Sequence, residues 1–281
     1  MTIKNSEGLD LSFDNRPIGV FDSGLGGLTS LKRIKALLPN ENIIYFGDTA
    51  RTPYGSKSVD TINQFSQQIT EFLLTRDVKI IAIACNTVSA ASLDNLKRNN
   101  PHIPFLGIIE PIVASLPGLI EENSTVAVIG TEVTIESKTY EKAIRQRLPK
   151  VKVVSQACPL FVTLIEEGLH DAPVMDAHIH YYLDDFIAEN RPDYLILGCT
   201  HYPLIKNKIK NIYPGIILLD PAFSQAEKIK ELLVSLNLRA DLEQKATYKF
   251  YASDLSTTFR QMIDTIMLDE KYSLKFTELR I

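Results

Sequence analysis

Short apolar runs alternate along the chain with longer amphipathic stretches, and this alternation limits the possible folds more than any other feature. The apolar runs are rich in Val and Ile, and many are apolar at consecutive positions. Such runs are typical of strands in a parallel sheet that is covered on both faces. The expected strands lie at residues 17–22, 42–48, 79–86, 103–109, 125–130, 151–156, 193–199 and 215–220.

The stretches between these runs have the spacing of amphipathic helices. In residues 60–76, the side chains Ile62, Phe65, Ile69, Phe72 and Leu73 recur three or four positions apart and form one apolar face. Residues 28–38 and 137–148 are expected to be helices too. Strands that alternate with helices predict an α/β fold with right-handed crossovers. Residues 246–253 are expected to add an edge strand, and the remaining C-terminal region is expected to be helical.

The two halves of the chain follow similar sequence patterns. The first half opens with "IGVFDSGLGG" and reaches "AIACNT", and the second opens with "VAVIGTEVT" and reaches "LILGCT". This pattern predicts two similar Rossmann-like domains with mainly parallel sheets and an active site in the cleft between them. Prolines place the domain crossings near Pro111 and Pro221. The expected first domain is 16–110 plus 222–281, the second is 111–221, and 1–15 is an N-terminal extension.

Composition excludes several classes of function. The chain has 281 residues and a net charge of −4, and it lacks a long basic run, so no nucleic-acid partner is expected. Residues 1–16 are polar rather than signal-like, and no apolar run is long enough to span a membrane. A cytoplasmic protein is therefore expected, with no membrane partner. Three cysteines without a CxxC pair argue against a disulfide framework or a cysteine-rich zinc site.

Cys85 and Cys199 lie in matching contexts, "ACNT" and "GCTH", where a strand stops and a helix begins. Backbone N–H groups at a helix start favour a thiolate, and His201 can act as an acid or a base near neutral pH. A single cysteine here would more often be a buried core residue. The repeated context favours function. Cys158 lacks polar neighbours of this kind and is interpreted as inert.

Three other loops carry candidate residues whose interpretation stays open. In "DSGLGG", Asp22 and Ser23 precede glycines that suit a carboxylate or phosphate, although a plain glycine turn capped by Asp22 fits equally well. In "DTARTPYG", Tyr54 and Gly55 could line a polar pocket, but alone the stretch reads as an ordinary loop. Glu166 or Glu167 could assist a base, or both could lie on a solvated helix face. The remaining histidines are interpreted as surface residues: His102, His170, His178 and His180.

Two matched thiols suit the inversion of a carbon acid. A thiolate on one side removes the proton from carbon, and a thiol on the opposite side delivers another proton to the other face. Cysteine fits because its pKa, about 8.5 when free, can be shifted toward neutrality. No metal-binding or pyridoxal-lysine motif is evident, so no cofactor and no metal are expected.

The sequence resembles the bacterial glutamate racemases of the aspartate/glutamate racemase family. The resemblance runs from about Pro17 to the C-terminal region and rests on "PIGVFDSGLGG", "YFGDTARTPYG", "ACNT", "GTEVTIES..Y", "CPLFVTLIEEG" and "LGCTHYPL", in that order. It implies a cofactor-independent enzyme that interconverts L- and D-glutamate for peptidoglycan. It also implies two α/β domains and a homodimer.

The resemblance also implies roles for individual residues. Cys85 would be the base for D-glutamate, assisted by Asp22. Cys199 would be the base for L-glutamate, assisted by His201 and by Glu166, the first acidic position of its motif. Residues that would hold the substrate are Asp22, Ser23, Tyr54, Gly55, Asn86, Thr87, Thr200 and His201, with Thr131 and Thr134 as weaker candidates.

Thr163 and Val133 depart from the family pattern, which commonly has proline and glycine there, and they are expected to alter loop geometry without loss of activity. Two other functions compete with glutamate racemisation. One is racemisation of another amino acid such as aspartate, which "GCTHYPL" and "DTARTPYG" disfavour. The other is amino-acid binding without catalysis, which would not need two thiols.

Overall fold

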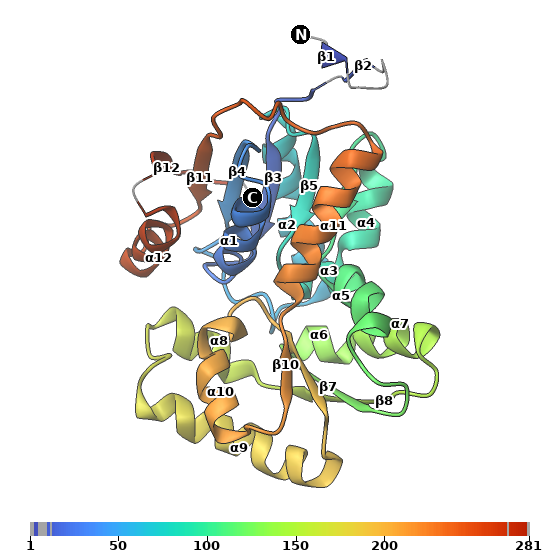
Figure 1. Cartoon of the computed structure of the whole chain (residues 1–281). Coiled ribbons are helices and arrows are strands. Elements are labelled where there is room, and N and C mark those ends of the chain that lie inside the picture. Colours follow the sequence, from blue (N-terminus) through green and yellow to red (C-terminus); the bar gives the residue numbers. More distant parts are fainter. Residues whose placement is uncertain (1–2, 5–9, 12, 269, 280–281) are drawn as a thin grey trace.

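The computed structural model describes residues 3–4, 10–11, 13–268 and 270–279. Its main feature is a pair of parallel sheets, one above the other in Figure 1, with helices around each. We call the six-stranded sheet and its helices the first lobe, and the four-stranded sheet and its helices the second lobe. Of the expected extension 1–15, residues 1–2, 5–9 and 12 lie outside the described part of the chain.

In the described chain, the first lobe contains a sheet with the strand order β12-β11-β4-β3-β5-β6, in which every neighbouring pair is parallel. Three central strands, β3, β4 and β5, are fully buried, as their runs of Val, Ile and Phe predict. The bounds are β3 Ile18–Asp22, β4 Ile43–Gly47, β5 Ile80–Ile83, β6 Phe105–Leu106, β11 Tyr248–Ala252 and β12 Tyr272–Phe276.

The second lobe contains a sheet with the strand order β10-β9-β7-β8, again parallel throughout the described residues. Its bounds are β7 Thr125–Gly130, β8 Lys152–Ala157, β9 Tyr194–Gly198 and β10 Ile217–Leu219. A separate antiparallel pair precedes both lobes and consists of β1 Ile3–Lys4 and β2 Asp10–Leu11.

Most helices connect consecutive strands, as crossovers between parallel strands require. Ser58 begins the long helix α2 with a side-chain cap on the Thr61 N–H, and Ile62, Ile69 and Leu73 form its buried face. The helix bounds are α1 Leu28–Leu37, α2 Val59–Leu74, α3 Asn86–Ala91, α4 Leu93–Asn99, α5 Ile109–Ser115, α6 Glu132–Glu136, α7 Thr139–Arg147, α8 Pro159–Glu166, α9 Pro173–Asn190, α10 Lys206–Ile212, α11 Pro221–Ser235 and α12 Thr257–Met267, with 3₁₀ turns η1 Leu116–Gly118 and η2 Tyr202–Ile205.

The predicted α/β class and all eight predicted strands in residues 17–220 are confirmed, but the C-terminal expectations were wrong in two respects. β11 is not an edge strand, because it lies between β12 and β4. The edge is β12, in a region expected to be helical. Its sequence "YSLKF" alternates apolar and polar side chains with a period of two, which suits a half-exposed strand.

The chain passes between the lobes through two helices that contact each other, α5 and α11 (Figure 1). Pro111 lies inside α5, and Pro221 is the first residue of α11, where proline is well tolerated. The domain boundaries proposed from these prolines therefore stay a prediction at the level of single residues. Among the described residues, no helix is both long enough and apolar enough to cross a lipid bilayer.

Candidate active site

The carboxyl ends of strands from both sheets meet at one small cavity. Asp22 ends β3, Cys85 follows β5, Thr131 follows β7 and Cys199 follows β9. The cavity has a volume of only about 10 Å³, and larger hollows lie elsewhere on the surface. Its lining comes from both lobes: Ser23, Pro53, Tyr54, Gly55, Cys85, Asn86, Thr87, Thr131, Val162, Cys199, Thr200 and His201.

Both cysteines are buried in the wall of this cavity, with 3% and 6% of their surface exposed. Cys85 belongs to the first lobe, and its Sγ lies 3.5 Å from Ser23 Oγ. Cys199 belongs to the second lobe, and its Sγ lies 3.7 Å from His201 Nδ1. The two sulfur atoms therefore reach the same space from opposite lobes and have different polar partners.

The environment of Cys85 holds the proton on sulfur. Burial, and after it the nearby Asp22 carboxylate, raise the pKa of Cys85 to about 12, against the lowering effect of hydrogen bonds from Ser23 and the Val88 N–H. Sequence reasoning expected the helix start to favour a thiolate. The structure shows the opposite for Cys85, because loss of solvent outweighs the N–H groups of a six-residue helix.

Cys199 is linked to a charged pair. His201 Nε2 lies 2.6 Å from Glu166 Oε1, while its Nδ1 faces the Cys199 sulfur. Burial alone would lower the pKa of His201, but hydrogen bonds to Cys199 and Glu166 raise it well above its ordinary value. These two contacts therefore favour the imidazolium form of His201. Glu167, the alternative considered from sequence, is exposed directly after the end of α8.

The N–H groups of the glycine loop after β3 bind a carboxyl group of the same loop, that of Asp22. The N–H groups of Gly24 and Gly27 donate to Asp22 Oδ2 at 3.0 and 2.9 Å, and Thr200 Oγ1 donates to Oδ1 at 3.2 Å. Burial raises the pKa of Asp22 above its ordinary value, although the charge on His201 and these N–H groups act to lower it. These two loop N–H groups are therefore taken by Asp22, as the capping interpretation predicts.

Two glycines of this loop are needed for close approach by the second lobe. A Cβ at Gly26 would lie 2.4 Å from His201 Nδ1, and one at Gly24 would lie 2.6 Å from Glu166 Oε1. No real Cβ tolerates such contacts. The backbone of this loop thus packs directly against His201 and Glu166, the side chains next to Cys199.

The predicted substrate-binding residues gather around the same cavity. Tyr54 donates its hydroxyl to the buried Asp48 carboxylate, and the carbonyls of Tyr54 and Gly55 accept from the Lys57 and Val133 N–H groups, so the backbone N–H groups of Tyr54 and Gly55 are the contacts left for a ligand. Asn86 Oδ1 accepts a 2.7 Å hydrogen bond from Tyr140, and its Nδ2 is buried without a partner among the described residues.

Hydroxyl groups join the lobes directly. Thr87 Oγ1 of the first lobe lies 3.0 Å from Thr131 Oγ1 and 3.4 Å from Thr134 Oγ1 of the second lobe. The Val133 N–H also donates to the Gly55 carbonyl at 3.2 Å. Val133 therefore forms part of the contact between lobes, rather than of a separate loop.

Sequence reasoning gave no role to Asp48, Tyr140 or Thr52, although all three lie within or beside the quoted motifs. Asp48 also accepts from Arg51 and Ser253, at 2.7 and 2.6 Å. The sequence did carry a signal for Asp48, because it lies at the end of a buried strand. A buried carboxylate there needs hydrogen-bond donors from neighbouring side chains. The Tyr140 contact joins residues 54 positions apart, and no local pattern indicates it.

The other residues singled out from sequence lie away from the cavity. Cys158 is buried in the core of the second lobe, and burial raises the pKa of its thiol. Thr163 is exposed within the regular helix α8. His102 and His180 are exposed, whereas His170 and His178 are half-buried. The described residues contain no group of three His, Cys, Asp or Glu side chains placed to hold a metal ion.

Comparison with known proteins identifies the family of this chain. The family model described as Asp/Glu/Hydantoin racemase matches residues 19–229. The chain belongs to this family. A glutamate racemase from Syntrophus aciditrophicus is 45% identical over 249 residues, which cover 88% of this chain and 90% of the relative. This family member is thus an amino-acid racemase.

Solved structures agree with the fold. Glutamate racemase from Francisella tularensis, in complex with D-glutamate, has a TM-score of 0.85 at 39% identity and covers 95% of this chain and 98% of its own. The isoform RacE1 from Bacillus anthracis has a TM-score of 0.87 at 33% identity, with the same coverage. The α/β architecture predicted from the alternating runs is therefore shared with these enzymes.

Proposed function

We propose that this racemase interconverts L- and D-glutamate without a cofactor, with Cys85 and Cys199 as the two acid–base groups. The observation that carries the proposal is that both thiols line one cavity from different lobes. A stereocentre held between them would face one sulfur on each side. Binding alone needs no such pair.

In the L to D direction, Cys199 as thiolate removes the proton from Cα and Cys85 as thiol delivers its own proton to the opposite face. The enzyme then carries a Cys85 thiolate and a Cys199 thiol, which is the form that accepts D-glutamate. The raised pKa of Cys85 supports its role as the acid in the first direction. The imidazolium of His201 supports negative charge on Cys199.

The carbanion formed at Cα needs hydrogen-bond donors on the substrate carboxylate, because charge spreads onto those oxygen atoms. The buried Nδ2 of Asn86 has no partner among the described residues, and Asn86 belongs to the cavity lining. Thr87 and Thr200 add hydroxyl groups to the same wall. We assign these donors to the substrate, together with Ser23 and the backbone of Tyr54 and Gly55.

Glutamate is favoured over aspartate because the relatives that cover most of this chain at over 40% identity are glutamate racemases. The D-glutamate in the Francisella structure further supports this choice. We extend the proposal to the supply of D-glutamate for peptidoglycan, in the cytoplasm and as a homodimer. The resemblance of the motifs supports these three extensions.

The test is a circular-dichroism assay of the purified chain with L-glutamate, D-glutamate and L-aspartate, without added cofactor. We expect turnover of both glutamate enantiomers and little turnover of aspartate. Cys85→Ala and Cys199→Ala should each abolish racemisation in both directions and keep the wild-type far-ultraviolet spectrum. Near-normal turnover by either variant would contradict the two-thiol mechanism, and turnover of aspartate alone would contradict the substrate.

A further inference from the structure

The two ends of the Asn86 amide have different surroundings. Its Oδ1 accepts a 2.7 Å hydrogen bond from the Tyr140 hydroxyl, while its Nδ2 is buried without a partner among the described residues. The carbonyl end of the amide is therefore occupied, and the nitrogen end is free. A buried N–H group without an acceptor is costly, so this end calls for a ligand that accepts hydrogen bonds.

The contact between Tyr140 and Asn86 joins the two lobes. Asn86 is the first residue of α3 in the first lobe, whereas Tyr140 lies in the first turn of α7 in the second lobe. The Tyr140 side chain is buried in a core cluster that includes Val128, Ile144 and Ile196. Close packing in such a core restricts the ring, so its hydroxyl has a fixed place beside Asn86.

The Tyr140 hydroxyl sets the direction of the amide. Burial, and after it the negative charges of Cys199 and Asp220, raise the pKa of the Tyr140 phenol above its ordinary value, so the phenol keeps its proton. Asn86 Oδ1 is the acceptor of that proton. A reversed amide would turn an N–H group toward the phenol oxygen and would take this acceptor away. Tyr140 therefore favours the orientation that leaves Nδ2 free.

The neighbouring contact between lobes carries no such direction. Thr87 Oγ1 lies 3.0 Å from Thr131 Oγ1 and 3.4 Å from Thr134 Oγ1, and either member of each pair can be the donor. Hydroxyl groups exchange donor and acceptor roles by rotating a proton, whereas an amide must turn over to exchange its ends. The contact of Tyr140 with Asn86 is therefore suited to keeping a donor aimed in one direction.

We propose that Tyr140 is a positioning residue for racemisation, whose hydroxyl holds the Asn86 carbonyl and so leaves the two N–H groups of Nδ2 for the substrate carboxylate. Asn86 lines the cavity together with both thiols, and Tyr140 is not part of that lining among the described residues. Negative charge moves onto the carboxylate oxygens when Cα loses its proton, so a donor that is already oriented stabilises the carbanion without first reorganising. This inference rests on the proposed function, which assigns Asn86 to the substrate.

The test variant is Tyr140→Phe, which removes the hydroxyl and keeps the ring. Tyr213→Phe is the matched control, because Tyr213 is another tyrosine of the second lobe and its hydroxyl donates to the exposed Asp184 at 2.6 Å, outside the cavity lining. We expect kcat/KM to fall about tenfold in Tyr140→Phe and to stay unchanged in Tyr213→Phe. Thermal unfolding checks each fold. Tyr140→Met, whose flexible side chain fills irregular gaps, replaces Tyr140→Phe if the phenylalanine variant does not fold.

A double-mutant cycle separates positioning from a merely structural role. Asn86→Ala removes the amide, so Tyr140 has nothing left to orient in the double variant Asn86→Ala/Tyr140→Phe. We expect Tyr140→Phe to change kcat/KM less than about twofold in the Asn86→Ala background, against about tenfold in the wild type. Damage to the packing of the second lobe would instead lower kcat/KM by the same factor in both backgrounds. Chiral chromatography after long incubation measures the slow variants.

Wild-type kinetics in Tyr140→Phe would overturn the inference. An equal loss in both backgrounds of the cycle, or an equal loss in Tyr213→Phe, would overturn it too. Each of these results leaves the proposed function intact as long as the wild-type enzyme racemises glutamate. Failure of the wild type to do so would instead remove the proposed function.

Discussion

Cys85 and Cys199 have the same place at a strand end but different surroundings. The Cys85 sulfur has a neutral partner, Ser23, and a nearby carboxylate, whereas Cys199 faces an imidazolium. A racemase with two inequivalent thiols starts each direction from a different resting proton arrangement. The site favours the arrangement with the proton on Cys85.

This difference predicts how the ionisation of the Cys85 thiol depends on pH in the free enzyme. Burial penalises the charged form, so the pKa of Cys85 lies above that of an exposed cysteine, at about 12. The proton stays on sulfur through neutral and mildly alkaline pH and is lost only as pH approaches that value. Thiolate absorbance of the wild type minus that of Cys85→Ala should show no step below pH 10, whereas a step near neutrality would contradict this environment.

Gly26 should be intolerant of any side chain. A Cβ at this position would lie 2.4 Å from His201 Nδ1 and 2.6 Å from Thr200 Oγ1, so alanine would displace the imidazole from Cys199. We expect Gly26→Ala to lower kcat/KM by about a hundredfold or more, since small misplacements of catalytic groups cost that much. Gly215→Ala is the control because no heavy atom lies within 4 Å of its Cβ position. Equal activity of the two variants would refute the claim that Gly26 is needed to leave room for His201.

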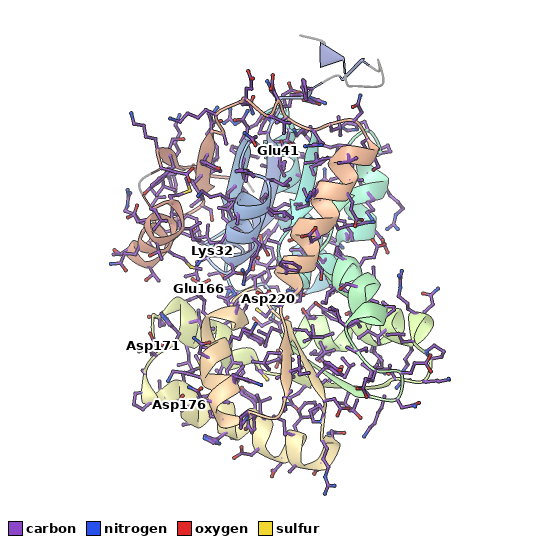
Figure 2. All side chains as sticks on the ribbon, viewed as in Figure 1. Lys32, Glu41, Glu166, Asp171, Asp176 and Asp220 are labelled. Carbon is purple, nitrogen blue, oxygen red and sulfur yellow. The ribbon has the colours of Figure 1, made fainter. Side chains whose placement is uncertain are left out.

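At the scale of elements, a buried ion pair fixes the end of the first sheet that lies away from the cavity, where Figure 2 labels Glu41. Lys79 Nζ lies 2.5 Å from Glu41 Oε2 and donates to the Asp14 carbonyl at 2.6 Å. The Ala240 N–H donates to Glu41 Oε1 at 2.8 Å. The pair thus joins the starts of β4 and β5 to the segments that precede β3 and β11.

Lys79→Met should lower the free energy of unfolding by about 3–5 kcal/mol, because it leaves the Glu41 carboxylate buried without a counter-charge. The double variant Lys79→Met/Glu41→Gln should recover part of this loss, since the unpaired charge is gone. Urea denaturation measures both. A loss below about 1 kcal/mol, which is typical of a surface pair, would show that the pair is not structurally important.

Buried strands could be predicted from the sequence, whereas the half-exposed edge strand could not. The strands β3 to β10 were evident because consecutive apolar side chains are needed on both faces of a covered sheet. β12 was missed because it is a half-exposed edge strand that includes Ser273 and Lys275. β11 was misplaced as the edge, because a strand's neighbours depend on distant pairing that no local pattern encodes.

At the scale of the whole molecule, the lobes meet so closely that the cavity has room for no more than about one water molecule. The contacts that close it are short hydroxyl and backbone contacts, led by Thr87 with Thr131 and Gly55 with Val133. An amino acid cannot reach the thiols in this state. The lobes must separate for substrate to bind and for product to leave.

A disulfide across this contact should therefore stop turnover. The Oγ1 atoms of Thr87 and Thr131 lie 3.0 Å apart, so Thr87→Cys/Thr131→Cys should form a bond under oxidising conditions. We expect the oxidised double variant to be inactive and the same sample to regain its activity after reduction. The wild type treated in the same way is the control for oxidation of its own thiols. Full activity of the oxidised variant would show that catalysis needs no opening.

Much of the site could be predicted from sequence because the motifs follow strand ends, and parallel strands bring their carboxyl ends together. Cys85, Cys199 and their polar neighbours were found in this way. The contacts that depend on the closed arrangement of the lobes were not found: Tyr140 with Asn86, and Glu166 against Gly24. Each needs the distance between two lobes, which sequence spacing does not contain.

The most direct test of the two-thiol account is the source of the hydrogen at Cα in the product. Unlabelled L-glutamate is racemised in D₂O and the reaction is stopped early, before product returns to the enzyme. The account predicts that D-glutamate carries deuterium at Cα, while unreacted L-glutamate keeps its original hydrogen. D-glutamate that retained the original hydrogen would show that one base carries the same proton across both faces, and would contradict the account.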